Sequence, residues 1–193
     1  TCSEDSRILL IDLSQIELRV LAHYSKEPVM IETLKDRKGD LHTATAIAMF
    51  GEVNSELRTV AKTLNFAVLY GAGGAALVEQ LNKALNNNTI SLSKAKDFKH
   101  KFFKGYPLVK QFLWDVQSRI SDRGYVLGKS GRKYYCEKDK AYRASNYLIQ
   151  GESAMLMKEM MVDAENYLSL RMTQLVNVIH DEFIFDLHNT DED

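Results

Sequence analysis

Cysteine is scarce in this chain. Only Cys2 and Cys136 occur among 193 residues, and neither stands at the spacing of a metal-binding cysteine pair. This scarcity argues against a disulfide-stabilised scaffold and favours a reducing compartment. Long apolar runs are also missing, because no segment approaches the roughly 20 apolar residues that span a membrane. We therefore expect no membrane partner.

The first residues lack the pattern of a signal peptide. The chain starts at Thr1 rather than at a methionine, and an apolar strand pattern is already under way at Ile8. We therefore expect a piece of a longer protein. The apolar share of 45% is ample for a hydrophobic core.

The net charge of −1 conceals an uneven distribution of charged residues. Residues 94–143 hold 14 basic and 5 acidic side chains, whereas residues 144–193 hold 2 basic and 10 acidic ones. A segment this basic can follow a phosphate backbone, because each neutralised phosphate releases counterions. It can equally be the solvated face of lysine-rich helices. The charge alone does not decide between these two interpretations.

Apolar periodicity predicts an α+β fold. Strands are expected at 7–13, in a hairpin at 124–136 and in a terminal hairpin at 175–187. Helices are expected over about 14–24, 41–50, 55–70, 75–86, 93–104, 107–122 and 139–170, the last with a break at Gly151. Asp40 is the expected N-cap of the helix at 41–50, and Gly51 ends it. The predicted architecture is a small antiparallel sheet with a large helical insertion.

Two acidic residues stand at the ends of apolar strands. Asp12 ends the first strand, and Asp181 lies in the terminal hairpin within His180-Asp181-Glu182. If the two strands meet, their carboxylates can hold two Mg²⁺ ions roughly 3.5 to 4 Å apart. Glu182 is a further candidate, although strand alternation points it away from Asp181. Each aspartate alone also fits an ordinary structural role, as an N-cap or a turn residue.

A stripe of cationic and aromatic side chains follows the helix predicted at 55–70. Arg58, Lys62, Phe66 and Tyr70 stand four residues apart and therefore share one face. Arginine and lysine can bind the β and γ phosphates of a nucleotide, and the aromatic rings can contact its sugar and base. The same spacing also occurs on ordinary surface helices whose aromatic residues are core.

Taken together, these motifs resemble a known enzyme family. Residues 12–19 (Asp-Leu-Ser-Gln-Ile-Glu-Leu-Arg), Arg58 through Gly71, and His180-Asp181-Glu182 resemble the three polymerase motifs of the family A DNA polymerases, the bacterial DNA polymerase I type. They occur in the family's order and span nearly the whole chain. Asp40-Leu41-His42 and the motif at 146–151 extend the resemblance, the latter in a form similar to phage members.

The resemblance implies roles for individual residues. Asp12 and Asp181 would carry the metals, Mg²⁺ or Mn²⁺ in its place, together with the carbonyl of Leu13. Glu17 would crowd the 2′-hydroxyl of a ribonucleotide. His42 would join Arg58 and Lys62 on the phosphates, with Gln15 nearby. The implied DNA contacts are Arg132, Arg143, Asn146, Gln150 and His180. In the family a basic residue usually stands four positions before the asparagine, where this chain has Tyr142 with Arg143 one step later.

The resemblance also implies an organisation. We expect palm at 1–24 and 123–193 and fingers at 25–122, with the thumb and exonuclease domains absent from this stretch. The expected partners are primer-template DNA and deoxynucleoside triphosphates, and the expected location is the cytoplasm of a bacterial or phage-infected cell. The oligomeric state is left open.

The leading interpretation is template-directed DNA synthesis by two-metal phosphoryl transfer. Two alternatives remain at this point. A single-subunit RNA polymerase shares the pattern from Lys62 to Gly71, but Glu17 and its neighbours argue against it. A noncatalytic nucleic-acid-binding module would use the basic segment and treat the acidic pair as structural. The second alternative predicts DNA binding that does not depend on metal.

Overall fold

The computed structural model describes residues 3, 5–36, 38–86 and 88–191. Their contacts form two compact units, one of residues 1–16 with 151–193 and the other of residues 17–150. We call them the sheet unit and the helical unit. The combination of many helices with small antiparallel sheets confirms the predicted α+β class. No helix among the described residues is both long and apolar enough to cross a membrane.

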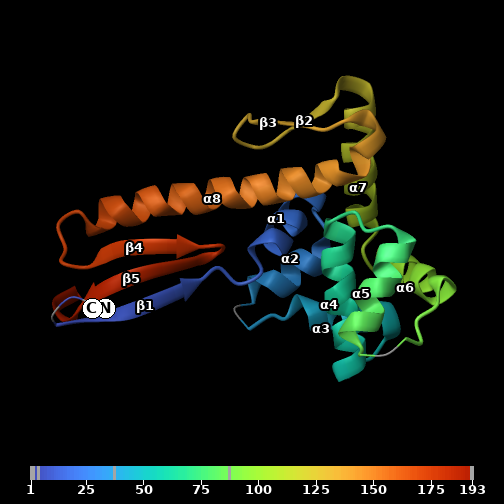
Figure 1. The fold of residues 1–193 in the computed structure, drawn as a ribbon, viewed down its shortest axis with the longest axis horizontal. Helices are drawn as coiled ribbons and strands as arrows, with labels where there is room; N and C mark the ends of the chain where they lie inside the picture. The colour runs from blue at the N-terminus through green and yellow to red at the C-terminus, as the bar shows by residue number, and fades with distance from the viewer. Residues whose placement is uncertain (1–2, 4, 37, 87, 192–193) are drawn as a thin grey trace. The chain divides into compact units, whose positions relative to one another are not determined.

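The sheet unit is built on three antiparallel strands in the order β1-β5-β4 (Figure 1). They are β1 (Ser6–Asp12), β4 (Gln174–Ile179) and β5 (Glu182–His188), followed by the short 3₁₀ helix η2 (Asn189–Asp191). The first strand of the chain therefore lies beside the last one, as predicted. The register places Ile11 opposite Phe183 and Asp12 opposite Glu182. Non-local pairing of this kind fixes the position of both acidic strand ends.

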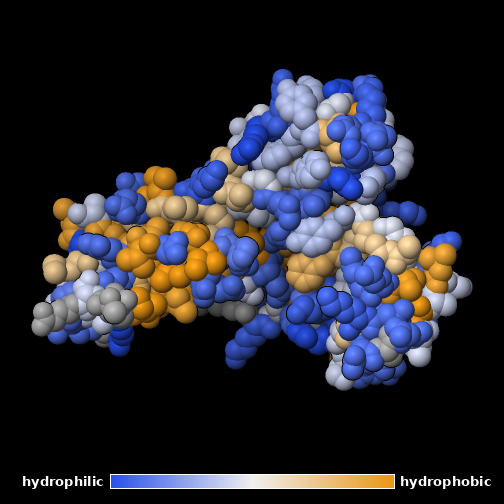
Figure 2. Space-filling view, in the orientation of Figure 1, coloured by the Kyte–Doolittle hydropathy of each residue, from blue (hydrophilic) through white to orange (hydrophobic). Residues whose placement is uncertain are grey.

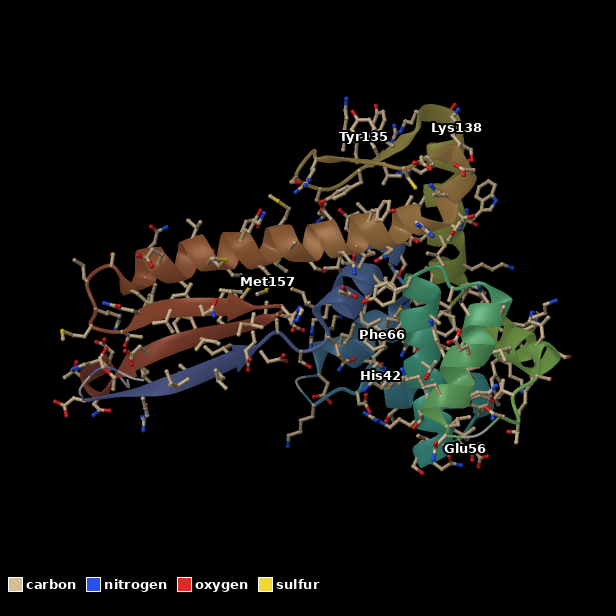
Figure 3. All side chains as sticks on the ribbon, in the orientation of Figure 1. His42, Glu56, Phe66, Tyr135, Lys138 and Met157 are labelled. Carbon is tan, nitrogen blue, oxygen red and sulfur yellow. The ribbon has the colours of Figure 1, made fainter. Side chains whose placement is uncertain are left out.

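Side-chain alternation gives the sheet two different faces. Phe183 and Phe185 point to one face, where both are buried and their rings stack with centroids 6.2 Å apart. Met157 of α8 (Ala144–Leu168) is also buried, and Figure 3 shows its side chain on the sheet side of that helix. Ile8 and Leu10 stay about half exposed. Figure 2 shows apolar residues gathered on this unit.

The helical unit contains most of the other elements. Its helices are α1 (Ile16–Ser25), α2 (Pro28–Lys35), α3 (Leu41–Phe50), α4 (Ser55–Leu69), α5 (Gly74–Ala84), α6 (Leu92–Gly105) and α7 (Pro107–Arg123). The hairpin of β2 (Tyr125–Leu127) and β3 (Lys133–Tyr135) follows, then the 3₁₀ helix η1 (Lys138–Arg143) and the first part of α8. One large apolar core joins α1 to α7, with Leu21, Leu64 and Phe102 fully buried.

Capping residues set the helix ends near the predicted site. The Asp40 side chain accepts a hydrogen bond from His42 N, and Gly51 adopts a left-handed conformation (φ 78°) after Phe50. Asn54 accepts from Leu57 N at the start of α4. Each such N-cap contributes about 1 kcal/mol to helix stability. The caps therefore fix the position at which α3 and α4 begin to present their side chains.

Most of the predicted elements are confirmed within one or two residues, with three differences. The helix α2 was not predicted, because its eight residues are too few for a clear period. Residues 138–143 form a 3₁₀ helix instead of the first turn of the long helix. The predicted break at Gly151 does not occur, since α8 runs through it. A glycine inside a 25-residue helix costs only about 1 kcal/mol.

Candidate active site

The acidic residues of β1 and the terminal hairpin lie together in the sheet unit. Asp12 is the last residue of β1 and pairs with Glu182, the first residue of β5. The backbone N–H of Leu13 donates to the carbonyl oxygen of Asp181 over 2.9 Å. Asp181 and His180 form the turn between β4 and β5, where His180 has φ 56°. The predicted meeting of the two strand ends is therefore confirmed.

The environment of these carboxylates suits a hard cation. In the described part of the chain, neither Asp12 nor Asp181 enters a salt bridge. No group of three or more His, Cys, Asp or Glu side chains that could hold a metal occurs among the described residues. Mg²⁺ typically binds only one or two protein carboxylates and completes its shell with water and substrate phosphates. One or two carboxylates are therefore enough for such an ion, without a full protein cage.

Leu13 and Gln15, which follow Asp12 closely in the sequence, were also predicted to belong to the site. The carbonyl oxygen of Leu13 accepts a hydrogen bond from Ile16 N over 3.1 Å, and one lone pair stays available for a ligand. Gln15 has φ 57°, and its buried Oε1 has no hydrogen-bond partner among the described residues. A left-handed conformation at a non-glycine residue is held by its surroundings and is common at functional sites.

The second group of predicted residues lies in the helical unit along α4. Arg58 and Lys62 are exposed, Phe66 is half-buried and Tyr70 is 40% exposed. The rings of Phe66 and Tyr70 stack nearly parallel, with centroids 6.3 Å apart. Figure 3 shows Phe66 near His42 of α3, and their ring centroids are 5.8 Å apart. The predicted cationic and aromatic stripe therefore exists on one helix face.

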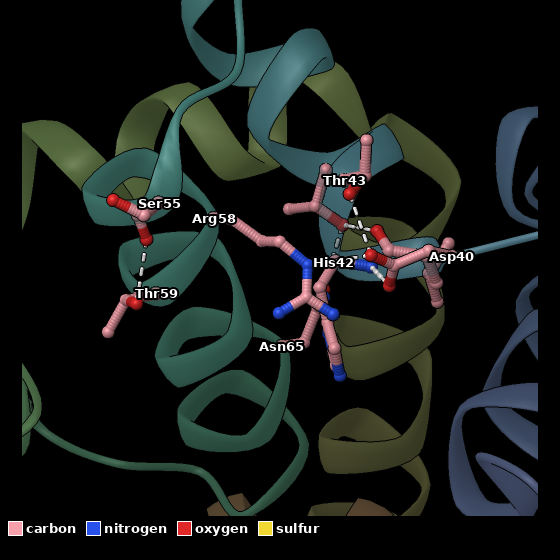
Figure 4. A network of polar contacts seen from close by, with 9 residues as sticks. Asp40, His42, Thr43, Ser55, Arg58, Thr59 and Asn65 are labelled. Carbon is pink, nitrogen blue, oxygen red and sulfur yellow. Dashed lines mark hydrogen bonds and ion pairs between the residues drawn. The ribbon is translucent and has the colours of Figure 1, made fainter.

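Arg58 is held in place by Asp40 (Figure 4). Its Nε donates to Asp40 Oδ2 over 2.7 Å, which leaves the two terminal nitrogens of the guanidinium for another acceptor. Burial alone would raise the pKa of Asp40, but hydrogen bonds from Arg58, Thr43 and the His42 backbone lower it to about 2. Asp40 therefore stays ionised and orients a cation next to His42.

Glu17 and Tyr70 are joined by a hydrogen bond across 53 residues. The Tyr70 hydroxyl donates to Glu17 Oε2 over 2.8 Å, and it also bonds the Gln150 side chain. Burial and the Glu17 carboxylate raise the pKa of Tyr70, so the phenol stays protonated and keeps donating. The predicted sugar-side residue, the predicted base-side residue and one predicted DNA contact are thus brought together.

The sequence analysis did not predict a group of buried polar residues that connects to His42. Asn65, Thr45 and Tyr106 are fully buried and connect to His42, whose Nδ1 lies 3.0 Å from Asn65 Nδ2. A signal was present, since Asn65 sits at an apolar position of the α4 period, where a polar residue needs a partner.

The remaining predicted DNA contacts belong to different elements. Arg132 sits at the tip of the β2–β3 hairpin with its guanidinium 5.5 Å from the Tyr134 ring. Arg143 ends η1, and its Nε donates to the Tyr142 hydroxyl over 3.1 Å. Asn146 and Gln150 stand one turn apart on α8 and share a face. His180 belongs to the turn beside Asp181. Their roles on DNA stay predictions.

Known proteins are similar to this chain in sequence. The family model described as DNA polymerase family A matches residues 1–193. DNA polymerase I of Helicobacter pylori is 34% identical over 96% of this chain and 21% of its own length, and that of Aquifex aeolicus is 33% identical over 94% and 32%. The chain thus spans a fifth to a third of these relatives.

A solved structure gives the same result. The POL domain of Pol1 from M. smegmatis, in complex with DNA primer-template and dNTP, superposes with a TM-score of 0.82 at 27% identity. The match covers 99% of this chain and 35% of that one. From the family match over residues 1–193 and this shared fold we conclude that the chain belongs to DNA polymerase family A.

Proposed function

We propose that this chain is the nucleotide- and metal-binding core of a DNA-directed DNA polymerase. In this proposal it adds deoxynucleotides to a primer 3′-hydroxyl under the direction of a template strand. The observation that carries the proposal is the pairing of Asp12 with Glu182 beside the Leu13–Asp181 hydrogen bond. It brings the acidic ends of β1 and the terminal hairpin to one place, as a nucleotidyl transfer site requires.

Asp12, Asp181 and the Leu13 carbonyl are the residues that would hold two Mg²⁺ ions, with Mn²⁺ as a substitute and Glu182 beside them. When bound, these ions supply activation of the attacking hydroxyl and charge stabilisation at the leaving phosphate. The oxygen-only donor set matches the preference of a hard cation. The absence of salt bridges to either aspartate in the described chain supports this role.

The helical unit would bind the incoming deoxynucleoside triphosphate. Arg58, fixed by Asp40, offers its terminal nitrogens as a fork of donors to the phosphates, and Lys62 adds a point charge. His42 and Gln15 are assigned to the same nucleotide. Phe66 and Tyr70 present stacked rings to the sugar and base. Positioning and charge stabilisation would supply most of the catalysis.

Primer-template DNA is the proposed macromolecular partner. Arg132, Arg143 and His180 would contact it, and Asn146 with Gln150 would read the minor groove from one face of α8. The basic stretch 94–143 supports this assignment by its charge. We further propose that 1–24 and 123–193 act as palm and 25–122 as fingers.

Primer extension tests the proposal. With Mg²⁺, primer-template DNA and deoxynucleoside triphosphates present, the chain should extend the primer. A chelator that removes Mg²⁺ should abolish the extension. Replacement Asp181→Ala should lower the rate by about 100-fold or more. The matched control is Glu159→Gln, an exposed acidic residue on α8.

Three outcomes would count against the proposal. Extension that persists undiminished in Asp181→Ala would remove the two-metal assignment. DNA binding without any extension, and without dependence on metal, would favour the noncatalytic nucleic-acid-binding module. Incorporation of ribonucleotides at the rate of deoxynucleotides would favour an RNA polymerase.

A further inference from the structure

A chain of buried polar side chains connects His42 to the corner between α6 and α7. His42 Nδ1 lies 3.0 Å from Asn65 Nδ2, Thr45 Oγ1 lies 3.1 Å from Asn65 Oδ1, and the Tyr106 hydroxyl lies 2.9 Å from Thr45 Oγ1. Asn65, Thr45 and Tyr106 are fully buried and His42 is 7% exposed. Figure 4 shows Asn65 beside His42. Buried polar groups of this kind are costly unless each has a partner.

The direction of the hydrogen bonds follows from the donors available. Burial raises the pKa of Tyr106 to about 12, so its hydroxyl keeps its proton and donates to Thr45. Thr45 has one proton, which it shares between the Leu41 carbonyl and Asn65 Oδ1. The structure orients the amide oxygen of Asn65 toward Thr45 Oγ1, so that the NH₂ group faces His42. An NH₂ group can only donate, so His42 Nδ1 must accept.

We propose that Asn65 is a positioning residue that holds the His42 ring in the tautomer with its proton on Nε2. The Nε2–H then points away from Asn65 and serves as a neutral hydrogen-bond donor to a phosphate oxygen. This inference rests on the proposed function, which assigns His42 to the triphosphate. In the described part of the chain, Nε2 makes no hydrogen bond, whereas Nδ1 does.

The charges around His42 agree with a neutral ring. Burial lowers the pKa of His42, and the cations Arg58 and Lys62 lower it further, while the Asp40 carboxylate acts in the opposite sense. A third cation beside Arg58 and Lys62 would be repelled by both. A neutral Nε2–H adds a donor to the phosphates without that repulsion, and its donation does not change as the pH passes through the physiological range.

The free protein tests the assignment without nucleotide. In the ¹⁵N-labelled chain at pH 7.5, the ring signals of His42 are identified by their loss in His42→Asn. We expect the shift of an unprotonated nitrogen for Nδ1 and that of a protonated nitrogen for Nε2. A proton on Nδ1 would overturn the proposal, because it would require Asn65 to present its oxygen to the ring.

A substitution at Asn65 adds a matched comparison. A carboxylate in Asn65→Asp can only accept, so it should move the proton to Nδ1 and raise the His42 pKa by about 1 pH unit or more. Thr59→Val is the control, because among the described residues the Thr59 hydroxyl bonds only the Ser55 carbonyl of its own helix. An unchanged tautomer and pKa in a folded Asn65→Asp protein would overturn the proposal. The wild-type measurement decides the matter if that variant does not fold.

Binding of dATP as a function of pH separates this inference from the proposed function. In Asn65→Asp, His42 Nε2 carries a proton only while the ring is cationic. The dissociation constant of dATP for this variant, divided by that for the wild type, should therefore rise about tenfold between pH 6 and pH 8.5. In Thr59→Val the ratio should stay constant. A wrong tautomer refutes the role of Asn65 alone. A flat ratio with the expected tautomer refutes the contact of His42 with the triphosphate, and with it that part of the proposed function.

Discussion

At the scale of single residues, the site depends on side chains that hold other side chains. Arg58 is fixed by Asp40, Glu17 by Tyr70, and His42 by Asn65. In each pair a group predicted from the sequence is oriented by a hydrogen bond of 2.7 to 3.0 Å. The partner lies far away in sequence in all three pairs. The positions of these proposed nucleotide-binding side chains are therefore set by the protein itself, which would lower the entropy cost of binding a nucleotide.

The Glu17–Tyr70 pair leads to a prediction about sugar selection. Removal of the carboxylate in Glu17→Ala should raise ribonucleotide incorporation relative to deoxynucleotides by about tenfold or more, because the group proposed to crowd the 2′-hydroxyl is lost. Tyr70→Phe keeps the ring stack with Phe66 and removes only the hydroxyl that holds Glu17, so it should give a smaller rise. Single-nucleotide insertion kinetics measure both. Unchanged discrimination in Glu17→Ala would remove this assignment.

The Asp40–Arg58 pair makes stability depend on pH. The pKa of Asp40 in the folded protein, about 2, lies below the ordinary aspartate value of 3.8. Its stabilising contribution is therefore complete above about pH 4 and is lost as the pH falls toward 2. Asp40 is 32% exposed, so solvent screening limits the contribution to about 1 kcal/mol.

Asp40→Asn is a suitable comparison, since asparagine keeps the N-cap and loses the charge. Urea unfolding at pH 6 and at pH 2.5 should show the wild type more stable than Asp40→Asn by about 1 kcal/mol at pH 6, with the difference much reduced at pH 2.5. A difference that does not change with pH would show that the ion pair contributes nothing measurable.

At the scale of elements, the sequence predicted what depends on local pattern. The bounds of α3 followed from Asp40 and Gly51, and those of α4 from the i, i+4 period and the glycines after Tyr70. The helix α2 lacked a long enough period, and η1 differs from an α-helix only in hydrogen bonding that local composition does not encode. The contact of the two acidic strand ends could be proposed from the sequence, because apolar strands of this length must pair.

The hydrogen-bond partners of the buried polar side chains could not be predicted from local sequence patterns. Nothing local to Asn65 indicates that it meets His42, because the contact joins α3 and α4 across 23 residues. The same holds for Tyr106 and Thr45, which are 61 residues apart. Residue type shows that a buried amide or hydroxyl needs a partner, whereas only the packing of helices shows which one it finds.

Gly71 lies in the loop that follows α4 and leads to a prediction about the stability of the fold. Its φ is 67°, and a Cβ atom there would lie 2.6 Å from the Tyr142 carbonyl oxygen. Gly71→Ala should therefore destabilise the fold by about 2 kcal/mol or more, from backbone strain and the close contact together. Gly73→Ala is the control, because a Cβ atom there meets nothing within 4 Å. It should change stability by at most about 1 kcal/mol. Equal urea midpoints for the two variants would contradict this account.

At the scale of the whole molecule, the distribution of charge along the chain matters more for the proposed binding of DNA and cations than the net charge does. The net charge of −1 would predict little attraction to DNA, but the stretch 94–143 carries 14 basic and 5 acidic residues. The acidic residues concentrate after it, where residues 144–193 hold 10 of them. An acidic region suits cation binding and a basic one suits phosphate binding. Asp181, a proposed metal ligand, lies in the acidic stretch, and the proposed DNA contacts Arg132 and Arg143 lie in the basic one.

This division predicts two distinguishable effects of mutation on DNA binding. Arg132→Gln and Arg143→Gln each remove a proposed phosphate contact, so each should weaken binding and reduce the slope of log K against log salt by about 0.9. Asn146→Ala and Gln150→Ala remove uncharged groups, so they should weaken binding without a change in slope. Fluorescence anisotropy on a primer-template duplex between 50 and 200 mM salt measures both quantities. Because counterion release counts only charge neutralised on the DNA, equal slopes for Arg132→Gln and the wild type would place the arginine away from the duplex, whatever its effect on affinity.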